Sequence, residues 1–141
     1  MAEFRLGQPR GVNTSETTTC AAVPDARLLG SKGERAAAVF LIANGCQVLD
    51  RNWRYGRTGD VDLVVKDGDT TVFVEVKTRT RVGPDSALAA VDQKKLNTLL
   101  RLGNAWLAQH GHWGPCRFDL VGVQLRPGRA PLFAWLQDVA Q

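Results

Sequence analysis

Cysteine is scarce in this chain, and its spacing excludes two common classes of small protein. The cysteines are Cys20, Cys46 and Cys116, and no two of them form a Cys-x-x-Cys motif. An odd and widely spaced set suits neither a disulfide framework nor a structural zinc site. The sequence therefore favours a reducing compartment, and we expect the protein to be cytoplasmic.

Long apolar runs are also missing from the 141 residues. No segment approaches the ~18 consecutive apolar residues that a transmembrane helix needs, and the N-terminal region lacks the apolar stretch of a signal peptide. We therefore expect no membrane span and no membrane partner. The length suits one domain. The net charge of +4 is compatible with binding nucleic acid but does not require it.

Regular periodicity is missing from the first part of the chain. Residues 1–27 are polar and aperiodic, so we expect a disordered N-terminal tail. The remaining residues, 28–141, are expected to form a single domain.

Two runs of alternating apolar residues, 59–65 and 72–79, flank a loop rich in turn-forming residues, and this predicts a β-hairpin. Charged residues stand inside both runs, with Asp62 in the first and Glu75 and Lys77 in the second. Because side chains alternate between faces along a strand, Glu75 and Lys77 share one face of the sheet.

The length of the hairpin loop decides how close the two carboxylates lie. A two-residue loop at Asp67-Gly68 places Asp62 diagonal to Glu75, whereas a four-residue loop from Asp67 to Thr70 places Asp62 directly opposite Glu75. In either register both carboxylates lie on one face, within ~5–8 Å of each other. A loop of three residues would separate them.

Two carboxylates at this separation repel each other, so a positive group is expected between them. Lys77 is one candidate, and a divalent cation is the other. Mg²⁺ commonly takes one or two carboxylates together with water and substrate phosphate. The oxygen ligands available for it here are the side chains of Asp62 and Glu75 and the backbone carbonyl of Val76.

The arrangement Asp62 … Glu75-Val76-Lys77 resembles the PD-(D/E)xK nuclease signature. A wider, ordered set of sequence blocks is similar to the YraN-like family of small bacterial proteins, which are predicted endonucleases related to archaeal Holliday junction resolvases. This chain has Asp60 where that family usually has glutamate. The blocks are Gly33-Glu34, Arg51-Asn52-Trp53-Arg54, Gly59-Asp60-Val61-Asp62-Leu63, Phe73-Val74-Glu75-Val76-Lys77, Lys95 and Arg117-Phe118-Asp119.

The resemblance implies a restriction-endonuclease-like α/β fold, with an α-β-β-β-α-β core in which a mixed sheet is flanked by helices. The local patterns agree with this fold. Further strands are predicted at 46–55 and 117–125, with a short C-terminal edge strand at 131–136. The strand–helix–strand succession predicts a crossover between parallel strands.

The first helix is expected to run from Ser31 to about Asn44 and to be closed by Gly45. Ser31 and Glu34 fit a capping box, in which Glu34 serves the helix terminus. Alternatively, Glu34 points toward the sheet, and the resemblance implies that a glutamate at this place reaches the metal site. Both interpretations stay open, since one residue can do both.

A second helix is expected from Pro84-Asp85 to about Gln109, and Lys95 falls on its apolar stripe. A lysine on an apolar face needs an acidic partner or a route to solvent. We expect Lys95 to reach the carboxylate cluster or the phosphate bound there. The apolar stripe consists of Leu88, Val91, Leu99, Leu102 and Trp106.

Arginines gather ahead of the hairpin, where no acidic residue lies between Arg51 and Arg57. Trp53 in the same stretch is expected to be a core residue. No residue set resembles a base-reading element, so we expect binding to depend on nucleic-acid structure rather than sequence. The candidate phosphate-binding residues are Arg51, Arg54, Arg79, Arg81 and Lys95.

Two further residue pairs are expected to have no catalytic role. Arg117 and Asp119 share a face of their predicted strand and are expected to pair with each other. His110 and His112 lie in a glycine-rich turn and are expected to be surface residues.

We therefore expect an endonuclease that depends on Mg²⁺ or Mn²⁺ and cleaves structured nucleic acid. Branched nucleic acid is the expected substrate, and DNA is expected rather than RNA. The expected roles are electrostatic: metal binding by the acids, and contact of Lys77 with the scissile phosphate or the attacking water. A homodimer is left open. The catalytic set is Asp62, Glu75, Lys77 and Glu34, and the metal ligands are Asp62, Glu75 and Val76.

Two alternatives belong to other functional classes. One is a non-catalytic nucleic-acid-binding module that keeps the nuclease fold. The other is a protein-interaction domain in which acid–lysine pairs are purely structural. Metal binding distinguishes the protein-interaction domain, which should bind no Mg²⁺ or Mn²⁺, from the endonuclease and the nucleic-acid-binding module, which should bind it.

Overall fold

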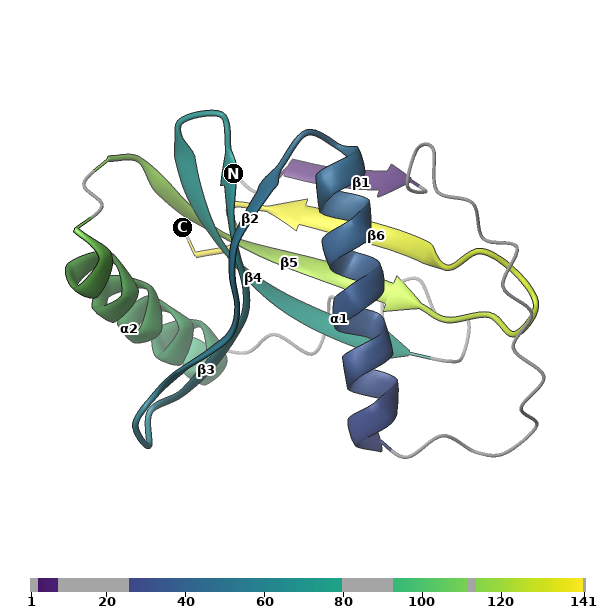
Figure 1. Ribbon diagram of the computed structural model, residues 1–141, viewed down its shortest axis with the longest axis horizontal. Helices are drawn as coiled ribbons and strands as arrows, with labels where there is room; N and C mark the ends of the chain where they lie inside the picture. Colours follow the sequence, from purple (N-terminus) through teal and green to yellow (C-terminus); the bar gives the residue numbers. More distant parts are fainter. Residues whose placement is uncertain (1–2, 8–25, 80–92, 112–113, 141) are drawn as a thin grey trace.

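The computed structural model describes residues 3–7, 26–79, 93–111 and 114–140, which form a six-stranded mixed sheet with two helices (Figure 1). The strands lie in the order β1-β6-β5-β4-β3-β2. Neither helix in these ranges is long and apolar enough to cross a membrane. In chain order the elements are β1 (Glu3–Gly7), α1 (Ala26–Ala43), β2 (Gln47–Tyr55), β3 (Gly59–Asp67), β4 (Thr70–Arg79), α2 (Gln93–His110), β5 (Cys116–Gln124) and β6 (Leu132–Gln137).

The predicted α-β-β-β-α-β core is confirmed by the succession α1-β2-β3-β4-α2-β5. β4 and β5 are parallel neighbours, as the expected crossover requires, and all other neighbouring strands are antiparallel. One detail differs from the prediction. β6 is not an edge strand, because β1 pairs with its outer side.

The N-terminal region departs from the sequence-based expectation in two ways. Residues 3–7 form β1, although they belong to the segment expected to be disordered. Helix α1 begins at Ala26, so Ser31 lies inside it and the predicted capping box is wrong. The physical reason is the run Ala26-Arg27-Leu28-Leu29, whose residues are good helix formers and extend the helix toward its N-terminus.

The other end of α1 agrees with the prediction. Gly45 has a φ of 96°, in the left-handed region that glycine adopts without strain. The Cys46 amide donates to the Leu41 carbonyl and the Gly45 amide donates to the Ile42 carbonyl. These two bonds form a Schellman motif, which ends the helix and starts the chain toward β2.

Several predictions concern residues outside the described ranges. They are Arg81, the start of the second helix at Pro84-Asp85, the residues Leu88 and Val91 of its stripe, His112 and most of the expected tail, 8–25.

The β3–β4 hairpin adopts one of the two registers that the sequence allowed. Lys66 pairs with Thr71 and Leu63 pairs with Val74, as the four-residue-loop alternative requires. The strands extend one pair farther, to Asp67 and Thr70, because Gly68 has a φ of 62° and permits a tighter turn.

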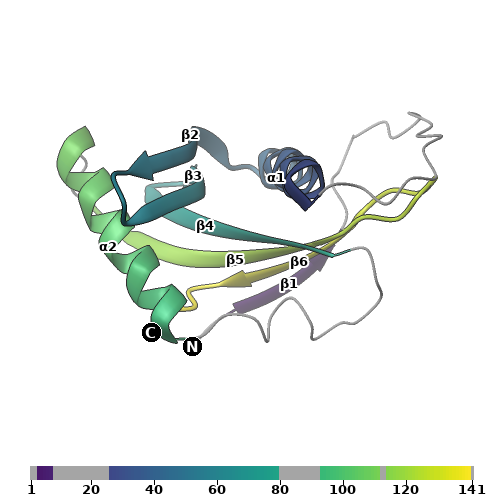
Figure 2. The ribbon, with the colours of Figure 1, turned by 90° about the horizontal axis from the view of Figure 1, so that it is seen from below.

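Alternation along β4 directs its side chains into two separate cores. Val72, Val74 and Val76 join the cluster that packs against α1, whereas Phe73 joins the cluster that packs against α2. Figure 2 shows α1 along one side of the sheet and α2 at one end of the sheet, beside the ribbon formed by the paired strands β2 and β3. The two helices therefore approach the sheet from different sides and are available to supply different functional groups.

Two glycines allow both helices to approach the sheet closely. A Cβ atom on Gly33 of α1 would overlap the side chain of Thr78 in β4. A Cβ atom on Gly103 of α2 would lie 2.7 Å from Cε1 of Phe118 and 3.1 Å from Cδ2 of Phe73. Larger residues at either position would push a helix away from β4, which carries Glu75 and Lys77.

The β2–β3 ribbon turns over at Asn52. Arg51 pairs with Leu63, which belongs to the α1-side core, whereas Trp53 pairs with Val61, which belongs to the α2-side core. Paired residues of antiparallel strands point to the same face, so the ribbon changes faces within two residues. Asn52 lies at that point with a φ of 48°, a left-handed conformation that asparagine tolerates better than most residues.

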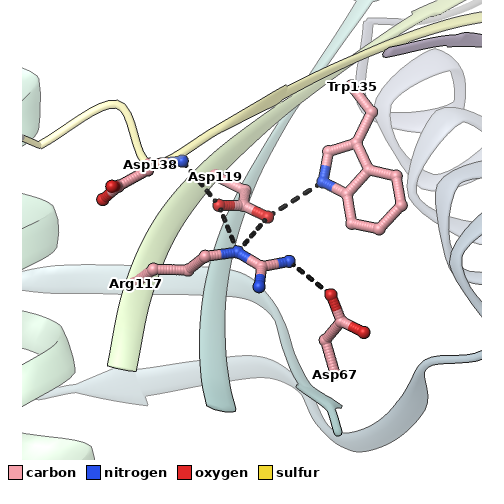
Figure 3. Close-up of polar contacts among 5 residues, drawn as sticks. All are labelled: Asp67, Arg117, Asp119, Trp135 and Asp138. Atoms are coloured by element: carbon pink, nitrogen blue, oxygen red, sulfur yellow. Dashed lines mark hydrogen bonds and ion pairs between the residues drawn. The ribbon is translucent and has the colours of Figure 1, made fainter. Parts of the chain in front are cut away.

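A buried carboxylate ties the C-terminal end of the described chain to the sheet (Figure 3). Asp119 accepts hydrogen bonds from Nε of Arg117 at 3.1 Å, Nε1 of Trp135 at 2.9 Å and the amide of Asp138 at 2.9 Å. Arg117 also donates to Asp67 at 2.7 Å, which links the hairpin end to β5. Burial raises the pKa of the Asp119 carboxyl, although these hydrogen bonds act in the opposite direction. The expected Arg117–Asp119 pair is thus confirmed.

We predict that Asp119→Asn lowers the free energy of unfolding by roughly 3 kcal/mol, because an amide replaces one acceptor oxygen with a donor that faces other buried donors. Urea denaturation measures the change. Asp69→Asn is the matched control, since Asp69 lies exposed at the hairpin tip and should change stability by less than ~0.5 kcal/mol. Equal stabilities for the two variants would contradict a structural role for Asp119.

Candidate active site

Asp62 lies where β3 separates from β4. The β3–β4 pairing ends at Leu63 and Val74, and at the next position the Asp62 carboxylate accepts a hydrogen bond from the Val76 amide at 2.8 Å. The Asp62 side chain thus supplies the hydrogen-bond acceptor for a β4 backbone amide at the point where the pairing with β3 ends. The bond also fixes Asp62 beside Glu75, the residue preceding Val76.

Glu75 is buried and is bound by two ammonium groups. Nζ of Lys77 and Nζ of Lys95 each lie 3.3 Å from Oε1 of Glu75. Lys77 reaches it along β4, and Lys95 reaches it from the first turns of α2. This confirms that the acidic partner of Lys95 belongs to the carboxylate cluster.

Glu34 of α1 completes the cluster from the other helix. Burial raises the pKa of the Glu34 carboxyl, a hydrogen bond with Asn52 lowers it, and the nearby charges of Asp60 and Glu75 raise it. A hydrogen bond with Asp62 also lowers it. Glu34 therefore points toward the sheet, as the second interpretation of its sequence position required.

The pKa of Asp62 is the most strongly perturbed in the cluster. Burial and then the charge of Glu75 raise it to about 8, and the hydrogen bond from the Val76 amide offsets only part of this effect. The charges of Glu34 and Asp60 raise it further. Four carboxyl groups thus interact electrostatically here, and a cation that binds among them would relieve the repulsion.

A small pocket of about 80 Å³ opens beside these groups, between α2 and the start of β3, and Glu75 of β4 also lines it. It has room for several water molecules. Asp60 lines the pocket together with Glu75 and Lys95. This is the position at which the YraN-like proteins that the sequence resembles usually have glutamate. The remaining lining residues are Thr58, Gly59, Thr98, Leu99 and Leu102.

The donor set suits a hard divalent cation. Asp62 and Glu75 offer carboxylate oxygens and Val76 offers a backbone carbonyl, and Mg²⁺ commonly binds through one or two carboxylates with water completing its shell. Within residues 3–7, 26–79, 93–111 and 114–140, no three His, Cys, Asp or Glu side chains converge as a preformed metal site. The fit is therefore to a site with two protein carboxylates, and not to a cage made entirely of protein ligands.

The predicted site residues fall into two groups. Asp62, Glu75, Lys77, Glu34 and Lys95 come together in one cluster, as the contacts above establish. Three of the predicted phosphate-binding arginines, Arg51, Arg54 and Arg79, lie outside it. Arg51 and Arg54 are exposed on β2, and Arg79 lies half-buried at the end of β4 with a bond from Nη1 to the Thr78 carbonyl.

The sequence-based interpretation gave Asn52 no role of its own. Its side chain contacts Glu34, and its left-handed backbone turns the β2–β3 ribbon over. One signal was available: asparagine is depleted in strands, yet here it stands in the middle of a predicted one.

Without divalent metal, we predict that the protein loses stability as pH rises from about 4 to about 8. Asp62 ionises near its ordinary pKa in the unfolded chain but only near 8 in the folded chain, so the unfolded state loses its proton first. The slope for one proton is at most ~1.4 kcal/mol per pH unit. Urea denaturation across this pH range measures it. The Asp62→Asn variant should give a flatter profile, and parallel profiles would contradict the raised pKa.

Comparisons with known proteins place this chain in a family. A UPF0102 protein of Nocardia farcinica is 42% identical over 126 residues, covering 89% of this chain and 98% of that protein. A UPF0102 protein of Frankia casuarinae is 47% identical over 105 residues, covering 74% of this chain and 87% of that protein.

Among solved structures, Pyrococcus furiosus SfsA in complex with Ca²⁺ matches 77% of this chain and 62% of its own, with 16% identity and a TM-score of 0.37. The model of the uncharacterised protein family UPF0102 matches residues 33–123, which is more than half of the chain and includes all the sequence blocks that resemble YraN-like proteins. The chain therefore belongs to the uncharacterised protein family UPF0102.

Proposed function

We propose that this protein is an endonuclease that depends on a divalent metal and hydrolyses phosphodiester bonds of structured nucleic acid, DNA ahead of RNA. One observation carries the proposal: Glu75 and Asp62 lie together at the end of the β3–β4 pairing, with Lys77 3.3 Å from Glu75. A protein that only bound phosphate would gain nothing from carboxylates that face it.

The residues that would hold the metal are Asp62, Glu75 and the carbonyl of Val76. Mg²⁺ or Mn²⁺ bound there would lower the pKa of a water molecule and neutralise the charge that builds on the phosphate. Asp62 is already held in place by the Val76 amide, so the chain orients this ligand before any metal arrives.

Lys77 and Lys95 would supply positive charge to the substrate. Both ammonium groups lie 3.3 Å from the same oxygen of Glu75, and a cation bound by Glu75 would compete with them for it. Their side chains are 24% and 45% exposed, so they can turn toward a phosphate. Glu34 would act as a positioning residue, since it contacts the Asp62 carboxyl.

The surrounding arginines would bind the nucleic-acid backbone. Arg51 and Arg54 project from β2, and Arg79 follows Lys77 along β4. Asp50 is the acidic residue that precedes Arg51 in the sequence. Its carboxylate accepts hydrogen bonds from the Arg51 amide and from Nε1 of Trp106. Backbone contacts of this kind position a substrate without reading its bases.

A non-catalytic nucleic-acid-binding module is the second candidate. One observation favours it: two lysines already neutralise Glu75, so the fold does not need a metal to balance that charge. The two candidates differ in whether the Asp62–Glu75 pair binds metal and supports cleavage.

We predict that the wild-type protein cleaves at least one member of a panel of branched, flapped and single-stranded DNA in Mn²⁺. Asp62→Asn should reduce cleavage at least ~100-fold, since it removes a charged metal ligand. Saturating Mg²⁺ or Mn²⁺ should raise the wild-type melting temperature by mass action, and this rise should vanish in Asp62→Asn.

Asp69→Asn provides the control, because it removes an exposed carboxylate of the same hairpin at the end away from the site. It should keep both cleavage and the metal-dependent rise. If the wild type bound DNA but showed neither cleavage nor a rise in melting temperature, the nuclease proposal would fail in favour of the binding module.

We also predict that replacing Arg51 and Arg54 together by Ala makes the affinity for DNA less dependent on salt. Each neutralised phosphate contributes ~0.9 to the slope of log affinity against log salt for duplex DNA, so the slope should fall by up to ~1.8. Arg129→Ala is the matched control, because Arg129 lies exposed between β5 and β6. An unchanged slope in the double variant would remove both arginines from the binding surface.

A further inference from the structure

An aromatic row leads from the core of the protein to its surface beside the carboxylate cluster. Tyr55 stacks on Trp53 with ring centroids 5.6 Å apart and an interplanar angle of 17°. Trp53 meets His110 edge to face at 6.4 Å, and His110 stacks on Trp106 at 4.1 Å. The members of the row come from two elements, β2 and the C-terminal half of α2.

We propose that Tyr55, supported by Trp53, is a platform on which an unpaired base of the nucleic acid stacks. The protein would then bind segments whose bases are not paired, such as single strands or the strand ends of a branched structure. This inference rests on the proposed function, which supplies the nucleic acid, and it specifies the class of substrate.

The row is held firmly at its inner end. Trp106 is 2% exposed, and its Nε1 donates to Asp50 at 3.1 Å. His110 is fixed by a 2.8 Å hydrogen-bond contact between Nδ1 and the Trp106 carbonyl. A preorganised aromatic surface loses little conformational entropy when a ligand stacks on it. The inner rings therefore set the orientation of the outer ones.

The outer end of the row is accessible. Tyr55 is 42% exposed, one of the few large apolar side chains in the described ranges that is exposed to this degree. The stacking on Trp53 accounts for only part of the ring surface, so the rest of the ring is open to a ligand. An exposed aromatic ring with a rigid support is the arrangement that base stacking uses.

The fold places this ring next to both the pocket and the basic residues. Tyr55 pairs with Gly59, which lines the pocket together with Glu75. Arg54 and Arg57, both exposed, lie on either side of Tyr55 in the sequence. A stacked base would therefore have positive charge available for its flanking phosphates, a combination typical of proteins that bind single strands.

Asn52 explains why these rings share the face of α2. The ribbon turns over between the Arg51–Leu63 and Trp53–Val61 pairs, so Trp53 points toward the α2-side core rather than the face of α1. Tyr55, two residues farther along β2, follows Trp53 onto the same face. The turn at Asn52 thus brings the platform to the side on which Lys95 and the pocket lie.

The test compares two DNA oligomers of about 12 nucleotides, one of thymidine and one entirely abasic, in buffer with EDTA. Both carry the same backbone charge, so repulsion from the carboxylates affects both equally. The wild type should bind the thymidine oligomer about 5- to 100-fold more tightly, the range expected for base–aromatic stacking. Tyr55→Ala should bring this preference to within about twofold of no preference, because base stacking on the ring is lost, and should keep its affinity for the abasic oligomer.

Three further variants separate stacking from other causes. Tyr55→Phe keeps the ring and should keep the preference within about twofold, because base–aromatic stacking needs the ring and not the hydroxyl. Tyr55→Leu keeps apolar bulk over Trp53 without a ring and should behave like Tyr55→Ala, which would show that the ring and not apolar bulk is needed. Retained affinity of both variants for the abasic oligomer excludes loss of folding as the cause. Leu132→Ala removes another exposed apolar side chain, on β6, and should change neither affinity.

The possible failures are distinguishable. If the wild type binds neither oligomer, duplex nor branched DNA, the proposed function fails and the platform fails with it. If it binds both oligomers and Tyr55→Ala weakens both equally or neither, the proposed function stands and the platform is refuted.

Discussion

The hydrogen bond from the Val76 amide to the Asp62 carboxylate is the contact on which the candidate site depends. The β3–β4 pairing ends at the preceding pair, Leu63 and Val74, and a backbone amide left there without an acceptor would be costly. The Asp62 side chain provides the acceptor. The same bond that completes β4 thus holds an acidic group beside Glu75, so the end of the hairpin pairing and the site are formed by one interaction.

Acidic groups this close need compensation, which α2 provides with a lysine, whereas α1 adds a further carboxyl group. Lys95 of α2 joins Lys77 at Glu75, while α1 brings Glu34 to Asp62. Each helix reaches β4 because a glycine faces the sheet, Gly33 in α1 and Gly103 in α2. The arrangement leaves Asp62 as the residue whose ionisation is least favoured, and that residue is the one whose charge a bound cation would stabilise.

Much of this architecture could be predicted from the sequence. The alternation at 72–79 and the turn residues after Lys66 restricted the hairpin to two useful registers, and the observed one places Asp62 at the level of Glu75. The start of α1 could not be predicted, because Ser31 and Glu34 match a capping signal as well as they match a helix interior. β1 was missed since five residues are too few for periodicity to show, and its pairing with β6 is a tertiary effect.

The irregularity of β2 has a consequence for the behaviour of the protein in concentrated solution. Among the described strands, β1 and β2 form the two edges of the sheet, and β2 is the longer, at nine residues. An open edge invites a neighbouring chain to add a strand, which leads to aggregation. The register shift between Val48 and Asp50 and the left-handed Asn52 interrupt the row of amides and carbonyls that such a strand would need. The feature that aims Trp53 toward α2 thereby also helps to keep separate copies of the chain from joining edge to edge.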